Sequence, residues 1–179
     1  MDLRTAIETR RSVRRFKSKD VSIDTIRDIM VQAKWAPSWK NTQTSHYIAV
    51  RNPDLILRLV NEATDFPNNK LIMSGAPVVM VQLIKDHISG YDKDGNPSTS
   101  MGDHFQSYDA GLSAQTFCLA AHGVGLGTVI MGLYSEKAVK EILDIDDTYR
   151  VAALIAMGYE EGTANAPARK DIDELLVIK

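Results

Sequence analysis

The strongest structural signal in the sequence is the stretch GAPVVMVQLI, residues 75–84. A nearly unbroken run of β-forming apolar residues follows Pro77. Such a run is typical of a central strand that is covered on both faces. We therefore predict a strand over residues 78–84 at the middle of a sheet.

Helical and strand patterns alternate on both sides of this strand. Asp2 and Ser22 are good N-caps for two helices with apolar residues at helical spacing, and Pro37 ends the second helix. The remaining predicted elements are strands over 47–50, 128–131 and 151–157 and helices over 54–62, 103–122 and 136–143. The order of elements predicts one α+β domain over residues 1–179, with a mostly antiparallel central sheet flanked by helices.

Two segments in the middle of the chain stand out. The helix predicted over 103–122 is rich in small residues and lacks a clear polar face, so we expect it to be buried inside the domain or at a subunit interface. Before it, residues 85–102 are polar and contain the turn signal Asp94-Gly95-Asn96-Pro97. This long loop is either a lid over a pocket or a plain surface excursion.

Composition excludes several classes of protein. The 179 residues include 21 Lys and Arg against 23 Asp and Glu, a net charge of -2, which argues against nucleic acid or an anionic membrane as partner. No leader and no membrane-spanning run is visible, so we expect a cytoplasmic protein. Cys118 is the single cysteine and lies in an apolar run, so we predict a buried packing role. No metal-site motif is found.

Cations cluster in RRSVRRFK, residues 10–17. Guanidinium groups bind phosphate through paired hydrogen bonds, and a serine hydroxyl adds another, so this segment is suited to a phosphorylated cofactor. The alternative is a basic surface turn.

A second polar loop is APSWKNTQ, residues 36–43. Its Asn and Gln side chains offer both donors and acceptors, as the uracil-like edge of a flavin requires. Taken alone, the loop also fits an ordinary turn.

The glycines of GVGLGT, residues 123–128, invite comparison with a dinucleotide-binding fingerprint. The segment follows a predicted helix, precedes a strand and lacks the third glycine, so a Rossmann fold is not expected. Its backbone could still lie close to a flat ligand over residues 125–132.

In order and spacing, these segments resemble the nitroreductase family of flavoproteins. The resemblance spans RRSVRRF, APSWKNTQ, GAPVVMV, YDAGLSAQTFCLAA, GLGTVIMG, AALIAMGY and PARK. It implies an α+β sandwich and an intertwined homodimer with two flavin mononucleotide (FMN) sites at the interface. Each site would use residues of both chains.

The resemblance also implies roles for particular residues. It implies N-terminal flavin contacts and a phosphate clamp from Arg10, Arg11, Ser12, Arg14 and Arg169. It implies contacts from the partner chain by Ser38, Asn41 and Gln43. The backbone wall beside the ring would be Val129, Met131 and Gly132, and the polar edge of the ring would meet Asn68 and Lys70.

The implied activity is transfer of hydride from NADH or NADPH through flavin N5 to a small oxidant such as a nitroaromatic or quinone, in a ping-pong cycle. No protein side chain is expected to be catalytic, because the cofactor performs the chemistry. Arg14 is the candidate cation that stabilises the reduced flavin. The alternatives are a relative with other flavin chemistry, such as fragmentation or dehalogenation, and a flavin-binding module without activity.

Overall fold

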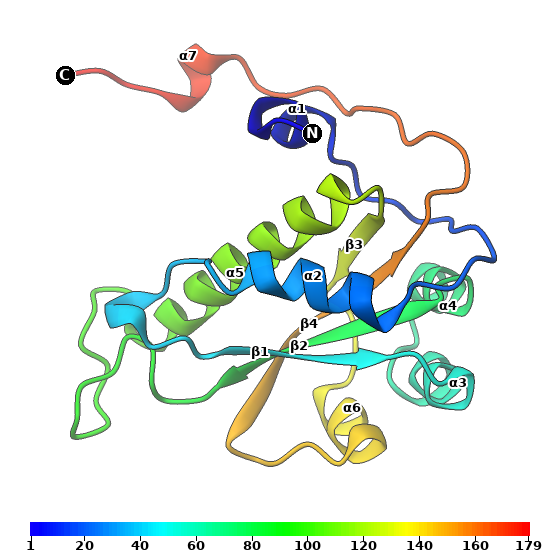
Figure 1. Cartoon of the computed structure of the whole chain (residues 1–179). Helices are drawn as coiled ribbons and strands as arrows, with labels where there is room; N and C mark the ends of the chain where they lie inside the picture. The colour runs from blue at the N-terminus through cyan, green and yellow to red at the C-terminus, as the bar shows by residue number, and fades with distance from the viewer.

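A computed structural model describes residues 1–179 and shows one antiparallel sheet with helices on both faces (Figure 1). The order across the sheet is β1-β2-β4-β3, and each neighbouring pair is antiparallel. The strands are β1 (Ser45–Val50), β2 (Val78–Lys85), β3 (Gly127–Met131) and β4 (Tyr149–Gly158). The predicted antiparallel sheet flanked by helices is confirmed.

The predicted central strand is β2, which lies between β1 and β4. Its side chains alternate between two cores, as the pleat of a strand requires. Val78 and Met80 face one hydrophobic cluster, whereas Val79 and Val81 face the other. Burial on both faces explains why the sequence of β2 is apolar almost without interruption.

One face of the sheet is covered by α2 (Ile23–Ala33) and α5 (Phe105–Gly123). The Ser22 hydroxyl accepts the Thr25 N–H at 3.0 Å and caps α2, which buries Ile26 and Ile29. The helix α5 buries residues along most of its length, including Phe117, so the expected buried helix is confirmed. It starts two residues later than predicted, because Gly102–His104 form the 3-10 turn η2.

The other face is covered by α3 (Pro53–Glu62), α4 (Pro67–Ser74) and α6 (Glu136–Leu143). The sequence patterns predict α3 and α6 but not α4. Pro67 stands in the first turn of α4 and Gly75 follows its last residue, which are normal start and stop signals. The helix buries Ile72 and Met73 against the sheet.

The segment between β2 and α5 forms a long loop, as predicted, whose regular features are the isolated bridge between Tyr91 and Pro97 and the 3-10 turn η2 at its end. The Asp92 carboxyl accepts the N–H groups of Asp94 and Asn96 and shapes the predicted turn. Ser89 is fully buried and Tyr91 nearly so, which anchors the start of the loop to the domain.

The chain begins with α1 (Leu3–Thr9), capped by Asp2 as expected, and ends with the short α7 (Ile172–Leu175). In Figure 1 the segment after β4 runs along the edge of the molecule past α1. More than half of the surface of each of several apolar residues in this tail is exposed: Ile172, Leu175, Leu176, Val177 and Ile178. None of the helices has the length and hydropathy that crossing a bilayer requires.

Candidate functional site

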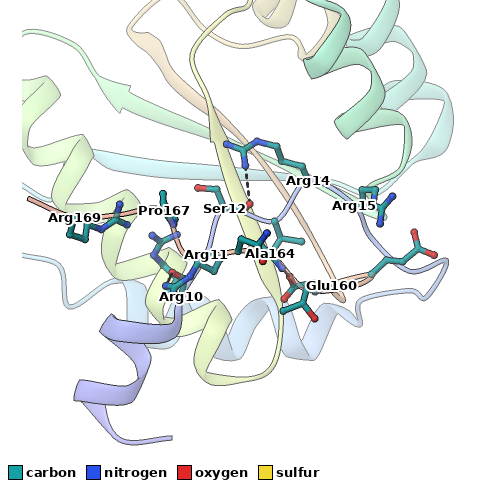
Figure 2. A pocket seen from close by; sticks show the side chains of 13 residues that line it. Arg10, Arg11, Ser12, Arg14, Arg15, Glu160, Ala164, Pro167 and Arg169 are labelled. Carbon is teal, nitrogen blue, oxygen red and sulfur yellow. Dashed lines mark hydrogen bonds between the residues drawn. The ribbon is translucent and has the colours of Figure 1, made fainter.

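The basic segment that follows α1 and the chain after β4 enclose a cavity of about 500 Å³. Five of the predicted site residues line it, namely Arg10, Arg11, Ser12, Arg14 and Arg169. Arg15 and Glu160 also line it, and Figure 2 shows them at the opposite end from Arg10 and Arg169. We refer to this space as the arginine cavity.

Main-chain hydrogen bonds hold the basic segment in place. The Val13 N–H donates to the Thr128 carbonyl at 2.9 Å, which attaches the segment to the start of β3. On the other side, Lys17 N–H donates to Tyr159 O at 2.8 Å and Glu161 N–H donates to Arg15 O at 3.0 Å. The segment is therefore clamped between β3 and the chain after β4, while Val13 and Phe16 point into the core.

Glycines make this close approach possible. A Cβ at Gly127 would lie 2.6 Å from Val13 Cβ, and a Cβ at Gly158 would lie 3.1 Å from Phe16 Cδ1. Both distances are shorter than van der Waals contact. Gly127, the first residue of β3, thus allows the basic segment to pack closely.

The guanidinium groups of the arginine cavity carry no acidic partner, since the ion pairs of the protein lie elsewhere. Arg11 donates from Nη1 to the carbonyls of Glu8 and Arg10, both at 2.8 Å, so part of its hydrogen-bonding capacity is used at the end of α1. Arg14 Nη1 donates to Ser12 O at 3.2 Å (Figure 2). Five arginines and two glutamates, Glu160 and Glu161, line the cavity, so its lining carries a net positive charge and is suited to an anionic ligand.

The positive charge of Arg10 also affects the pKa of His122, which lies near the end of α5. Partial burial, followed by the positive charge of Arg10, lowers the pKa of His122, and Glu160 acts in the opposite direction. The Nε2 atom of His122 lies 2.8 Å from the Thr9 hydroxyl.

A second predicted set, Ser38, Asn41 and Gln43, lies in a loop between α2 and β1 that contains the 3-10 turn η1 (Trp39–Asn41). Ser38 and Gln43 line a separate cavity of about 140 Å³, and Asn41 is exposed. Within one chain, this loop and the arginine cavity lie toward opposite ends of α2 (Figure 1). The structure therefore does not bring the two predicted sets together in a single chain.

The remaining predicted residues occupy other places. Val129 and Met131 are buried in the core, so only their backbone could meet a ligand. Gly132 lines a cavity of about 580 Å³ that also includes Phe66 and Tyr134. Asn68 is exposed on α4 and Lys70 is partly buried there.

Some residues of these sites carry no sequence signal. Thr163 and Asn165 line the arginine cavity from an irregular segment with no motif. Asn69, the neighbour of Asn68, is buried and donates to Leu133 O at 3.0 Å, next to Gly132. Asp109, inside α5, accepts the backbone N–H of Trp39 at 2.8 Å. Only the fold brings these partners together.

Cys118 has the buried position predicted for it, and burial raises the pKa of its thiol. No three His, Cys, Asp or Glu side chains lie close enough to one another to hold a metal ion.

Comparisons with known proteins agree with the family resemblance read from the motifs. Residues 7–159 match the sequence profile of the nitroreductase family. A relative from Archaeoglobus fulgidus, provisionally named NADH dehydrogenase/NAD(P)H nitroreductase, is 29% identical over an alignment of 157 positions that covers 86% of this chain and 82% of the relative. Iodotyrosine deiodinase of Nematostella vectensis is 23% identical over 199 residues, covering 97% of this chain and 74% of that protein.

Among solved structures, a Desulfovibrio desulfuricans protein in complex with FMN is similar with a TM-score of 0.82 and 26% identity. The match covers 100% of this chain and 97% of that chain. The fold and the family predicted from the sequence are therefore confirmed.

Proposed function

Because the chain belongs to the nitroreductase family, we propose that it is an FMN-dependent oxidoreductase in which flavin N5 passes hydride from NADH or NADPH to a small oxidant, such as a nitroaromatic or quinone, in a ping-pong cycle. The observation that carries the proposal is the arginine cavity on a chain of this family. Its cations have no acidic partner, so they are free to hold a phosphate.

The residues of the arginine cavity fit the phosphate and the adjoining part of FMN. Arg10 and Arg169 extend toward the same end of the cavity in Figure 2, where two guanidinium groups would share one phosphate. Ser12 would add a hydroxyl donor. Arg14 would supply a positive charge that offsets the negative charge developing on the pyrimidine edge of the ring.

Backbone groups would complete the binding site. Val129 and Met131 would contribute main chain beside the ring, because their side chains belong to the core. Gly132 carries no side chain, and a Cβ there would meet nothing within 4 Å, so a flat ring could approach it closely. Asn68 and Lys70 on α4 would face the polar edge of the ring.

The proposed active form is a homodimer. Ser38, Asn41 and Gln43 lie away from the arginine cavity of their own chain, so a second chain would have to present them to the same flavin. The exposed apolar residues of the C-terminal tail support this arrangement, because a partner would remove them from water. Leu3 and Ile7 are also exposed, and their helix α1 lies near the C-terminal tail in Figure 1.

Reductive dehalogenation is a second candidate, favoured by the similarity to an iodotyrosine deiodinase. Dehalogenation would use the same arginine cavity for FMN and differ only in the molecule that is reduced. A flavin-binding protein without activity is the third possibility.

Absorption spectra of the purified protein with added FMN, followed by anaerobic bleaching with NADH or NADPH, test the proposal. We expect flavin binding, bleaching by a nicotinamide, and steady turnover with a quinone or nitroaromatic. Release of iodide from iodotyrosine, without turnover of the other acceptors, would support dehalogenation. Tight FMN binding without any oxidation of NADH or NADPH would leave the non-catalytic candidate, and no bound flavin would overturn all three.

A further inference from the structure

The loop formed by residues 38–43 has a strained backbone. Three of its non-glycine residues have positive φ angles: Lys40 at 49°, Asn41 at 55° and Gln43 at 50°. For residues with a Cβ, this left-handed conformation costs about 1–2 kcal/mol each. Such conformations persist only where the surrounding structure holds them, and they gather at functional sites.

Hydrogen bonds inside the loop hold only part of this conformation. The Ser38 hydroxyl accepts the Gln43 N–H at 2.9 Å, and the Ser38 carbonyl accepts the Asn41 N–H at 3.0 Å. These bonds close the turn on itself. They do not fix its orientation relative to the rest of the domain.

The connection to the domain is made by Asp109. Its Oδ2 atom accepts the Trp39 N–H at 2.8 Å, and this is the one hydrogen bond between residues 38–43 and a side chain elsewhere in the protein. The same oxygen accepts the Ser89 hydroxyl at 2.5 Å. Asp109 is 2% exposed and Ser89 is 0% exposed, so the three groups form a buried junction between α5, the loop and the start of segment 85–102.

At this junction a buried carboxyl group lacks a cationic partner, which is unusual for a contact that only stabilises the fold. Burying a carboxyl group is costly unless it is paired, and Asp109 forms no ion pair with a Lys, Arg or His. The two donors to its carboxyl group, the Trp39 N–H and the Ser89 hydroxyl, belong to two different loops. Such an acceptor fixes both loops to the rigid helix α5.

We propose that Asp109 is a positioning residue that holds the loop of residues 38–43 in the conformation that presents Ser38, Asn41 and Gln43 to the flavin. This inference rests on the proposed function. Asp109 does not itself touch the flavin. It acts through the Trp39 N–H, and through Ser89 it ties segment 85–102 to the same point.

The first test compares Asp109→Ala with Asp109→Asn. Alanine leaves the Trp39 N–H without an acceptor, and we expect amide hydrogen exchange over residues 39–43 of the flavin-free protein to accelerate about tenfold or more. FMN affinity should fall by about tenfold as well. Asparagine keeps an oxygen acceptor in the same place and should restore both quantities to near the original values.

Ser113→Ala is the matched control. Ser113 lies one turn further along α5, is buried, and makes its hydrogen bond to the Tyr47 hydroxyl at 2.8 Å rather than to the loop. Its loss should leave exchange over residues 39–43 unchanged. If Asp109→Ala fails to fold, the double variant Asp109→Leu with Ser89→Ala removes the acceptor and its second donor together, which is less damaging than leaving one buried group unpaired.

The possible results separate the two proposals. Loop exchange and FMN affinity equal to those of Ser113→Ala would overturn the positioning role, and so would an Asp109→Asn variant as impaired as Asp109→Ala. Failure of the unaltered protein to bind FMN would overturn the proposed function, whereas the exchange measurement on the flavin-free protein would still test whether Asp109 holds the loop.

Discussion

The arginine cavity and the loop of residues 38–43 carry the two halves of the proposed flavin site, and they are stabilised in opposite ways. The basic segment of the arginine cavity is fixed by main-chain hydrogen bonds on both sides, and glycines allow the close packing. The loop has a strained backbone and one hydrogen bond to a side chain outside it, which the Trp39 N–H donates to the Asp109 carboxyl group. Close packing and main-chain hydrogen bonds hold the first region, whereas a few polar contacts hold the second. We therefore expect substitutions to act differently in the two regions.

The largest expected effect is the loss of a cation from the arginine cavity. Arg10→Ala should weaken FMN binding by about 1.5–3 kcal/mol, or roughly 10- to 150-fold, because a charged hydrogen bond to the phosphate is lost. Arg15→Ala is the control, since Arg15 lines the other end of the cavity beside Glu160 (Figure 2). Fluorescence titration of FMN measures both variants. Equal affinities would show that the phosphate does not bind where Arg10 and Arg169 meet.

The packing of the basic segment is tested at Gly127. A methyl group there would overlap Val13, so Gly127→Ala should lower the free energy of unfolding by about 1–3 kcal/mol and weaken FMN binding as the segment shifts. Gly123→Ala, where a Cβ meets nothing within 4 Å, should leave both quantities nearly unchanged. Urea denaturation gives the stabilities. Similar values for the two variants would mean that the segment is not held by close packing.

The sequence predicts the residues of the arginine cavity better than it predicts the contacts of the loop of residues 38–43, because the first are local in the chain and the second are not. Arg10, Ser12 and Arg14 are neighbours in the chain, so their gathering is a local property. Asp109 lies 70 residues from Trp39, and inside an apolar helix it carries no motif. Only the packing of α5 against the sheet shows why a carboxyl group is buried there.

The same distinction applies to the fold. The strand β2 and the helix α2 were visible because their apolar residues recur with a regular period. The helix α4 was not, since Pro67, Asn68 and Asn69 are residues typical of turns and its apolar residues are few. The spacing of apolar residues shows which side chains are buried within one chain. It does not show which surface contacts a second chain, so this pattern could not predict the proposed dimer.

A glycine substitution tests the backbone strain in the loop of residues 38–43. Lys40 has φ 49°, so Lys40→Gly should raise the free energy of unfolding by about 0.5–1 kcal/mol, because glycine adopts this conformation without steric cost. Lys34→Gly is the control, with φ −61° and a side chain that also lies over a neighbouring tryptophan ring. It should lower stability by about 0.5–1 kcal/mol. The same sign for both variants in thermal or urea unfolding would mean that the loop is not strained.

The smallest expected effect is the pH dependence of stability that His122 contributes through its burial and its proximity to Arg10. Burial and then Arg10 lower the pKa of His122 in the folded protein, so the unfolded chain binds more protons near the ordinary histidine pKa of about 6.5. Stability should therefore fall as the pH drops through about 6.5, and His122→Gln should remove that part of the loss. Because the side chain is only partly buried and solvent screens its charge, the difference should stay below about 0.5 kcal/mol. Urea unfolding at pH 8 and pH 5.5 measures it, with His104→Gln as control because its side chain is 81% exposed. A larger loss of stability at pH 5.5 in His122→Gln than in the unaltered protein would reverse the sign and show that the folded protein does not disfavour the charged form of His122.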